Sequence, residues 1–379
     1  AKLGIAREVK KTLAICSSKI DEVTGDEDIN DIISLIETPV LDATSKIYQG
    51  SDNKPEVIGG EITDYIEFLK ENKNDMIGIS TGFPAYDEAI GGGLRRKCVD
   101  LVAARPKVGK SMFGDAVAMH VSKNLGIPVL VLDTEMSKED HLNRMLANLS
   151  GVEINTVASG KFDNNQLNTE KVENAASELG EIPFHYVSIA GQPFENILSI
   201  MRKWVYQEVG FDENGRTKDC LIVYDYLKLM GSESISSSMQ EYQVLGFQIT
   251  QLHNFCVKYD VPCLSFVQLN RDGITKESTD VVSGSDRLIW LCTSFSIFKL
   301  KSDEEIADDT DENGNRKLVP IVARHGAGLD DGDYINMNMF GKFGKLVEGQ
   351  TRNELRTKST IKDTGFESGD QQPADIEAV

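Results

Sequence analysis

The stretch that most constrains this chain is Ala103–Ser111, which reads A-A-R-P-K-V-G-K-S. It follows the apolar run 99–103, in which Asp100 is the one polar residue, and it precedes the stretch 112–121, which favours a helix. We therefore predict a buried strand, a tight loop and a helix. Loops of the form G-x-x-x-x-G-K-[ST] in this setting bind phosphate through backbone N–H groups and the partial positive charge of the helix N-terminus.

This loop predicts a site for ATP with Mg²⁺. Lys110 would contact the β- and γ-phosphates, and the hydroxyl of Ser111 would bind the metal ion. Ala104 stands where the pattern has its first glycine, and its methyl group is tolerable if this residue has a negative φ. The alternative is a Gly-Lys-Ser turn that merely opens a helix. The predicted phosphate-binding residues are Arg105, Pro106, Lys107, Val108, Gly109, Lys110, Ser111 and Met112.

A second apolar strand, 221–224, ends in the acid Asp225. In nucleotide-binding α/β proteins, such an acid lies beside the phosphate loop and holds Mg²⁺ through water. Taken alone, an aspartate after a strand is often only a turn or helix-capping residue. The presence of a phosphate loop upstream favours the metal site.

Two further polar residues follow apolar strands. Glu135 comes after the strand 129–132, and it is the best candidate for the carboxylate that activates water without binding the metal. Its alternative role is that of an acid stabilised by a helix N-terminus. Gln268 ends the strand 263–267 and could donate a hydrogen bond to the γ-phosphate; the alternative is a polar strand end paired with backbone.

Length and charge limit the possible classes of protein. A chain of 379 residues with 40% hydrophobic residues can form one large domain with accessory segments. The net charge of −20 argues against a broad basic surface for duplex DNA, but not against a narrow contact with single-stranded DNA. We expect the acidic block 303–312 to be a solvated loop.

The sequence contains no run of 18 apolar residues, and charged residues interrupt its apolar N-terminus. We therefore expect a cytoplasmic protein without a membrane segment or signal peptide. The six cysteines include no C-x-x-C pair. We expect reduced, buried thiols and no zinc site.

The N-terminal part has helical periodicity over 4–20 and 29–48, so residues 1–48 are predicted to form a helical hairpin. Residues 49–76 are predicted to be a linker that contains a helix over 61–71. Ile62, Tyr65, Ile66 and Leu69 lie on one face of this helix. That face would pack either on its own domain or on a neighbouring subunit.

The main domain is predicted to span 77–349 as an α/β fold, with a mainly parallel sheet covered by helices on both faces. A disordered acidic tail is expected over 350–379. Buried strands are expected at 99–103, 129–132, 221–224, 263–267, 288–300 and 318–323, and closing antiparallel strands at 334–339 and 344–347.

Four segments occur in the order and spacing of the DnaB family of replicative DNA helicases, which the chain resembles over about residues 55–348. They are the loop 103–111, D-T-E-M-S at 133–137, L-I-V-Y-D-Y-L-K-L-M at 221–230 and Q-L-N-R at 268–271. The resemblance implies a RecA-like P-loop NTPase fold and a homohexameric ring with ATP between subunits. It also implies 5′ to 3′ translocation on single-stranded DNA and unwinding of duplex.

The resemblance further implies that 1–48 is the remnant of a region that contacts primase and the helicase loader, and that the helix 61–71 docks on the next subunit. It assigns site roles residue by residue. These are Lys110 on phosphate, Ser111 and Asp225 on Mg²⁺, Glu135 as catalytic base, Gln268 as γ-phosphate sensor, and Arg144 beside the site.

The chain departs from the family near its C-terminus. The family has Lys-x-Arg-x-Gly on a strand that reaches the neighbour's ATP, whereas I-V-A-R-H-G-A-G at 321–328 puts Arg324 at the lysine and Gly326 at the arginine. We predict that the guanidinium of Arg324 supplies the missing charge at the transferred phosphoryl group. A surface arginine at a strand end is the alternative.

The loops that hold DNA in the family correspond to 231–241 and 272–286, which here are rich in small residues. Small residues allow backbone N–H groups to approach phosphate. The alternative is a pair of flexible loops without a ligand. The predicted DNA-binding residues are Lys276, Ser283, Gly284 and Arg287.

Two other functions compete with a helicase motor. Gly-Gly-Gly-Leu at 91–94 is similar to the lead-in of RadA- or KaiC-like RecA ATPases, although the run after Asp225 argues against them. A nucleotide-switched assembly partner without unwinding activity is the other candidate. The altered arginine position favours that candidate, and the presence of Glu135 disfavours it.

Overall fold

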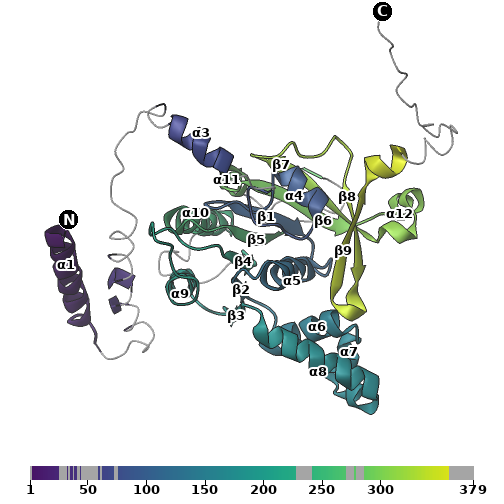
Figure 1. Cartoon of the computed structure of the whole chain (residues 1–379), viewed down its shortest axis with the longest axis horizontal. Coiled ribbons are helices and arrows are strands. Elements are labelled where there is room, and N and C mark those ends of the chain that lie inside the picture. The colour runs from purple at the N-terminus through teal and green to yellow at the C-terminus, as the bar shows by residue number, and fades with distance from the viewer. Residues whose placement is uncertain are drawn as a thin grey trace, which may run out of the picture.

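The computed structural model describes residues 2–24, 62–71, 76–227, 241–269 and 286–357, together with positions 32, 35, 36, 38–40, 43, 59, 277 and 278. Its centre is one nine-stranded sheet in the order β3-β2-β4-β5-β1-β6-β7-β8-β9 (Figure 1). The strands from β3 to β6 are parallel, and β7, β8 and β9 are antiparallel to their neighbours. The strands are β1 Val99–Ala104, β2 Val129–Asp133, β3 Phe184–Ser188, β4 Leu221–Asp225, β5 Cys263–Gln268, β6 Ser294–Leu300, β7 Arg316–Ala323, β8 Ile335–Phe340 and β9 Lys345–Thr351.

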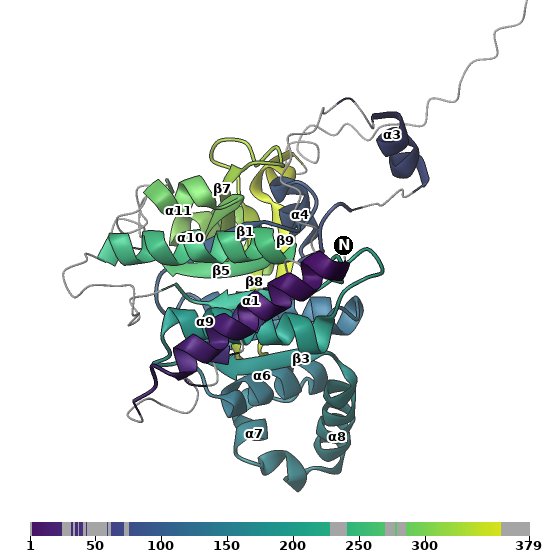
Figure 2. The ribbon, with the colours of Figure 1, turned by 90° about the vertical axis from the view of Figure 1, so that its left-hand side faces the viewer.

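Both faces of the sheet are covered, as the apolar strands predicted. Along β1, Leu101 and Ala103 belong to one core, and Val102 and Ala104 belong to the other. The first core lies under α9 (Phe194–Trp204), α10 (Glu241–Tyr259) and α11 (Asp286–Leu291), and Figure 2 shows these helices on one side of the sheet. The second lies under α4 (Pro84–Ile90) and α5 (Lys110–Met119). Each buried aliphatic side chain contributes about 1.5–3 kcal/mol to folding.

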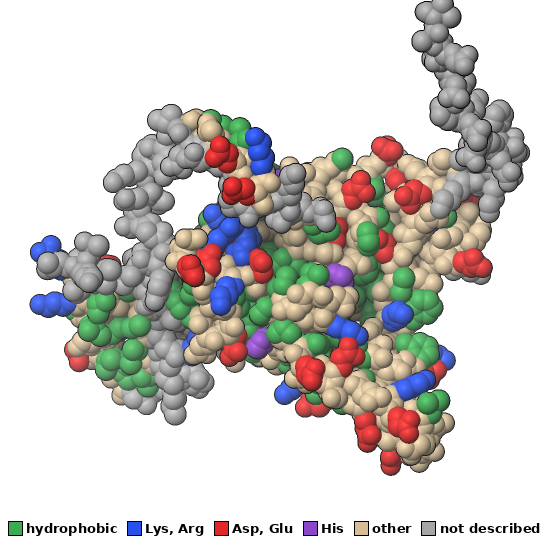
Figure 3. Space-filling view, viewed as in Figure 1, with side chains coloured by type: hydrophobic (Ala, Val, Ile, Leu, Met, Phe, Trp, Pro, Cys, Tyr) green, Lys and Arg blue, Asp and Glu red, His purple; other side chains and the backbone are tan. Residues whose placement is uncertain are grey.

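A small helical lobe follows β2 and extends past the β3 edge of the sheet (Figure 1). Its core consists of Ala147, Val152, Val157 and Val172. Figure 3 shows acidic side chains interspersed with basic ones over this lobe. The lobe contains α6 Lys138–Ser150, α7 Ile154–Ala158, the 3₁₀ turn η2 Lys161–Asn164 and α8 Gln166–Glu181.

The remaining short elements extend or connect these parts. Two π-helical turns, η1 (His120–Asn124) and η3 (Val205–Val209), prolong α5 and α9. Helix α12 (Asp303–Asp309) and the turns η6 (Asp311–Asn313) and η7 (Gly341–Phe343) lie among the last strands.

The start of the domain is bound to its end through Glu348 of β9. Its carboxylate accepts hydrogen bonds from the backbone N–H groups of Ala85 and Tyr86, each at 3.0 Å. Phe83, the N-cap residue of α4, provides no side-chain hydrogen bond. Glu348 therefore satisfies N–H groups of the first turn that would otherwise lack a partner inside the helix.

Two predictions about secondary structure were wrong, and one strand was missed. The apolar run 288–300 is not one strand, because α11 ends at Leu291 and β6 starts at Ser294. Strand β3 was missed because its side chains are only partly buried and form no continuous apolar run. The acidic block contains a helix, α12, whose start is stabilised by a capping box between Ser302 and Glu305.

Helix α12 is anchored by buried charge rather than solvated. Asp309 is buried and forms an ion pair with Lys301 at 2.9 Å, and it accepts a hydrogen bond from the hydroxyl of Tyr334 at 2.6 Å. Glu305 is paired with the buried Lys317 of β7. Two acids of this block therefore neutralise a lysine just after β6 and a lysine of β7.

Two helices at the N-terminal end agree with the sequence prediction. They are α1 (Lys2–Ile20) and α3 (Ile62–Glu71). The apolar face of α3 is exposed, with 57% of Tyr65 and 47% of Leu69 accessible. Figure 3 shows a similar collection of hydrophobic side chains on α1. The second helix of the predicted hairpin falls mostly outside the described residues.

At the C-terminal end, β9 continues to Thr351, and a helical turn covers 352–357. The described structure therefore continues past the predicted boundary at 349, and the rest of the predicted tail, 358–379, lies outside it. Within the described residues, no helix combines the length and apolar character needed to cross a membrane.

Candidate nucleotide-binding site

The phosphate loop connects β1 to α5 at the carboxyl edge of the parallel strands. Ala104 is buried in β1 and has a negative φ, so the prediction that its methyl group is tolerated is confirmed. The turn uses positive φ at Lys107 (66°) and Gly109 (119°), and Gly109 is the N-cap of α5. A Cβ at position 109 would lie 2.6 Å from Sδ of Met339, which places β8 against the loop.

Two arginines fix this loop, one within it and one on β7. Arg105 donates a hydrogen bond to the carbonyl of Leu269 at 2.8 Å. Arg316 of β7 donates its Nε–H to the carbonyl of Val108 at 2.8 Å, and burial lowers the pKa of its guanidinium. The role of Arg316 was not predicted, because no local pattern connects residues so far apart in the chain. The side chain of Val108, one of the predicted phosphate-binding residues, is buried in the core.

Lys110, Ser111 and Asp225 meet at one point. Nζ of Lys110 lies 2.6 Å from Oδ1 of Asp225, and the Ser111 hydroxyl donates to Oδ2 at 2.5 Å. Burial lowers the pKa of Lys110 and raises the pKa of Asp225, and the ion pair between them opposes both shifts. Lys110 also lies 3.2 Å from the ring centroid of Tyr226.

The donors at this point fit Mg²⁺. A hydroxyl and a carboxylate oxygen are the hard ligands that Mg²⁺ prefers, and it completes its coordination with phosphate oxygens and water. Among the described residues, no group of three or more His, Cys, Asp or Glu side chains could hold a metal ion. The hydroxyl of Ser111 and the carboxylate of Asp225 therefore fit a Mg²⁺ ion that is bound together with the phosphates of a nucleotide.

Glu135 lies in the turn after β2, close to Asp225, because Asp133 pairs with Asp225 in the sheet register. One carboxylate oxygen of Asp133 accepts hydrogen bonds from the backbone N–H groups of Glu135 (2.5 Å) and Met136 (2.7 Å). Helix α6 is capped by Ser137, so Glu135 lies before the helix. Glu135 still lies beside the N-terminus of α6, so its position is compatible with both of its predicted roles.

A cavity of about 490 Å³ brings most of the predicted residues together. Gln268 lies beside Ala104 in the sheet register, and Arg144 of α6 lies 3.3 Å from Asp115 of α5. Tyr226 and Met339 were not predicted as lining residues, although Tyr226 lies within the motif at 221–230. The lining residues are Ala104, Arg105, Pro106, Lys107, Gly109, Lys110, Ser111, Met112, Glu135, Arg144, Tyr226, Gln268 and Met339.

Arg324 is the one predicted catalytic residue that lies away from this cavity. It follows β7, which runs antiparallel to β6, so it lies at the edge where the parallel strands begin. Its N–H donates to the carbonyl of Thr293 at 3.0 Å, and its guanidinium donates to the carbonyl of Trp290. Arg324 lies at the opposite edge from the phosphate loop and cannot reach the loop of its own chain.

Packing explains why position 326 carries glycine. A Cβ at Gly326 would lie 2.0 Å from the carbonyl oxygen of Ala89 and 2.6 Å from the N atom of Gly91. These are backbone atoms, so an arginine does not fit here without displacement of α4. Among the residues 321–328, Arg324 is the only guanidinium.

Of the predicted DNA-binding residues, the structure describes Arg287. It is exposed in the first turn of α11 and lies over Gly246 of α10. Lys276, Ser283 and Gly284 lie outside the described residues.

In this mainly parallel sheet, the phosphate loop follows β1, Asp225 ends β4, which is two strands away, and Glu135 follows β2, the next strand. This arrangement defines a RecA-like P-loop nucleotide-binding protein. The family model described as "DnaB-like helicase C terminal domain" matches residues 78–282, which is more than half of the chain. The chain belongs to this family.

Curated relatives and solved structures agree with this assignment. A replicative DNA helicase DnaB from Synechocystis is 27% identical over 62% of this chain and 26% of its own length. The corresponding protein from Pasteurella multocida is 28% identical over 64% of this chain and 51% of its own length. The chain thus spans about half or less of these relatives.

Two solved structures share the fold at 18% identity. The first is an isolated ATPase domain, which is covered completely and superposes on 78% of this chain with a TM-score of 0.67. The second is a DnaB-like replicative helicase, reported with its interactions with primase, which superposes on 90% of this chain with a TM-score of 0.68.

Proposed function

We propose that this chain is the ATP-hydrolysing motor of a replicative DNA helicase, a homohexameric ring that moves 5′ to 3′ on single-stranded DNA and unwinds duplex. The observation that carries the proposal is that the predicted catalytic residues lie at two opposite edges of the sheet. Lys110, Ser111, Glu135 and Gln268 line one cavity with Asp225 beside them, whereas Arg324 lies at the opposite edge of the sheet. A second copy of the chain would supply the missing charge.

The residues at the cavity support hydrolysis of ATP. The amides of the loop and Lys110 would hold the β- and γ-phosphates, and Ser111 and Asp225 would hold Mg²⁺. Bound Mg²⁺ would neutralise charge on the phosphates. Glu135 would orient and polarise the attacking water, and Gln268 would donate a hydrogen bond to the γ-phosphate. Lys110 would exchange its pairing with Asp225 for contact with phosphate.

The remaining surfaces support assembly on DNA. The exposed apolar face of α3 fits a helix that docks on the next subunit. Arg287, which is exposed at the start of α11, would contact a DNA backbone. We extend the proposal to primase as a partner, because a structural neighbour is reported with its interactions with primase. The protein would act in a bacterial cytoplasm or a phage-infected cell.

The experiment is a mixing assay with two inactive variants. Arg324→Ala should bind a fluorescent ATP analogue normally and lose DNA-stimulated hydrolysis by ~10³-fold or more, the contribution expected of an arginine finger. Glu135→Gln should be inactive in the same way. In mixed rings, a site with Glu135 from one variant and Arg324 from the other is complete, so mixing should restore part of the activity.

Unwinding of forked DNA is measured in the same samples. Strand displacement that requires ATP would distinguish a helicase from a RecA-like ATPase or a nucleotide switch. Arg287→Ala should weaken binding of a labelled oligonucleotide. Unchanged turnover in Arg324→Ala, or full activity of a monomer, would refute the proposal that two subunits share each ATP site.

A further inference from the structure

A buried group of charges lies behind the cavity. His141 of α6 is 2% exposed, and its two ring nitrogens face two carboxylates. Nδ1 is 2.9 Å from Oδ1 of Asp115 on α5, and Nε2 is 3.1 Å from Oδ2 of Asp133 at the end of β2. The imidazole thus connects three elements: the helix that follows the phosphate loop, the strand that precedes Glu135, and α6.

Both carboxylates extend this connection toward the cavity. The other oxygen of Asp133 accepts the backbone N–H groups of Glu135 and Met136. The other oxygen of Asp115 lies 3.3 Å from Arg144, which lines the cavity. A continuous chain of contacts therefore runs from Arg144 through His141 to the turn that carries Glu135.

The two carboxylates favour the charged form of the imidazole. Burial disfavours the charged form of His141, but Asp115 and Asp133 outweigh it and raise its pKa to about 9. Burial likewise opposes ionisation of Asp133, but His141 and the two N–H groups outweigh it and lower its pKa. With Arg144, the group balances two positive against two negative charges at neutral pH.

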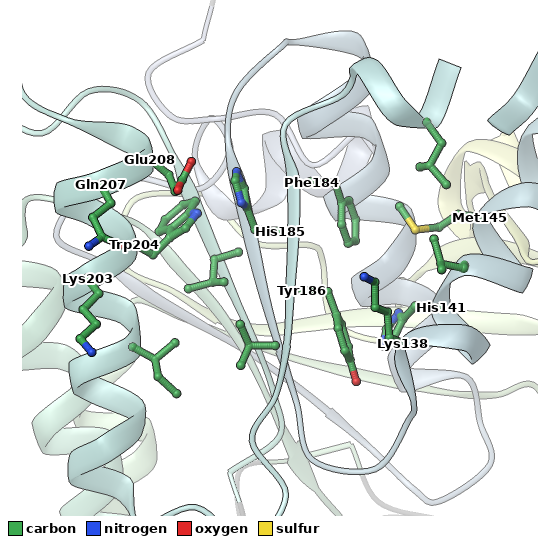
Figure 4. A pocket seen from close by; sticks show the side chains of 15 residues that line it. Lys138, His141, Met145, Phe184, His185, Tyr186, Lys203, Trp204, Gln207 and Glu208 are labelled. Atoms are coloured by element: carbon green, nitrogen blue, oxygen red, sulfur yellow. The ribbon is translucent and has the colours of Figure 1, made fainter. Parts of the chain in front are cut away.

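Tyr186 of β3 supports the same turn from the other side. Its ring centroid lies 4.7 Å from that of His141, and its hydroxyl donates to the carbonyl of Met136 at 2.5 Å. Figure 4 shows Tyr186, His141 and Lys138 close together at one end of a neighbouring pocket, away from Trp204. Lys138 of α6 is thus a further charge beside His141, and Tyr186 and Asp133 together fix the backbone around Glu135.

We propose that His141 is a positioning residue for ATP hydrolysis. As an imidazolium paired with Asp115 and Asp133, it holds the Asp133 turn in the orientation that aims Glu135 at the attacking water. It also fixes this turn relative to the helix of the phosphate loop. The inference rests on the proposed role of Glu135 as the catalytic base.

The test compares His141→Asn with the matched control His185→Asn. His185 lies on β3 beside Trp204 and forms none of these contacts. His141→Asn should lower kcat ~10- to 100-fold, because misplacement of a catalytic group by about 1 Å has effects of that size. The KM for ATP and the Kd for a fluorescent ATP analogue should change less than about twofold, since His141 does not line the nucleotide cavity. His185→Asn should leave all three unchanged.

A double-mutant cycle separates positioning from general structure. In single-turnover hydrolysis, His141→Asn added to Glu135→Gln should cause no further loss, because its effect passes through the missing carboxylate. Additive losses, or a weakened Kd for the nucleotide, would overturn the inference. Thermal unfolding and circular dichroism of each variant identify any that fail to fold, and Asp115→Asn, which keeps the shape of the side chain, serves as the second variant.

The pH profile gives an independent readout. The kcat of the wild-type protein should fall as pH rises through about 9, and Asp115→Asn should move this fall to lower pH, because His141 loses one of its two carboxylates. An unmoved profile would contradict the inference. Full hydrolysis by Glu135→Gln would instead refute the proposed catalytic base, so the two failures are distinguishable.

Discussion

Asp100 provides the sharpest test of how this sheet tolerates charge. It is the second residue of the central strand β1 and is 2% exposed. One of its oxygens accepts a hydrogen bond from the hydroxyl of Ser294 at 2.6 Å, and the other has no hydrogen-bond partner among the described residues. Burial raises its pKa from 3.8 to about 7, although Ser294 and Arg95 oppose the shift. We predict that Asp100→Asn relieves this conflict at high pH.

The sign and size follow from the two pKa values. Well below pH 3.8 the carboxyl is protonated in both states, and its full contribution to stability is present. As pH rises to about 7, the unfolded chain releases its proton first, so stability falls by about 1.4 kcal/mol per pH unit. Above the folded pKa, the loss is complete. Between pH ~5 and ~8, the stability of Asp100→Asn should therefore improve relative to wild type by about 3 kcal/mol.

The measurement is urea denaturation of both proteins at the two pH values, with Asp163→Asn as an exposed control. The difference in free energy of unfolding between Asp100→Asn and wild type should be pH-dependent, and the difference for the control should not. If Asp100→Asn differs from wild type by the same amount at both pH values, then Asp100 does not titrate in the folded protein and the reasoning fails.

Two further predictions concern packing around the site. Gly326→Ala should destabilise the protein by about 1–3 kcal/mol, seen as a lower Tm, because its methyl group would collide with the carbonyl of Ala89. The control is Gly341→Ala, where a Cβ would meet open space. Equal Tm values for the two variants would contradict the packing argument. Arg316→Met should weaken the Kd for an ATP analogue about tenfold, a free energy of ~1.4 kcal/mol, since it removes the charged donor to the carbonyl of Val108. Arg316→Lys, which lacks the Nε–H, should weaken it too, and unchanged binding by both would show that the loop holds its shape alone.

The sequence predicts those parts of the site that depend on short local patterns of residues. The phosphate loop, the acid after β4 and the turn that carries Glu135 each follow an apolar strand, and parallel strands bring their carboxyl ends to one edge. The sheet with helices on both faces follows from the same runs of buried residues. Gln268 is found in the same way, at the end of β5.

The parts that escape prediction depend on contacts between distant segments. Arg316 holds the loop from β7, and His141 is buried between α5 and β2, yet both residues look like ordinary polar positions in the sequence. The acidic block misleads for a related reason. In the sequence its charges are typical of a solvated loop, whereas in the structure Lys301 and Lys317 lie beside two of its acids.

The order of the strands sets when the chain can fold during synthesis. β1 is made first, yet its two neighbours are β5 and β6, so the strand that carries the phosphate loop has no partner until residue 263 has emerged. The N–H groups at the start of α4 have no partner until Glu348, still later in the chain, has been synthesised. Pairing of such distant segments is slow and leaves strand edges open. A ribosome-bound chain that stops before β5 should therefore be far more sensitive to protease, and more dependent on chaperones, than the complete chain.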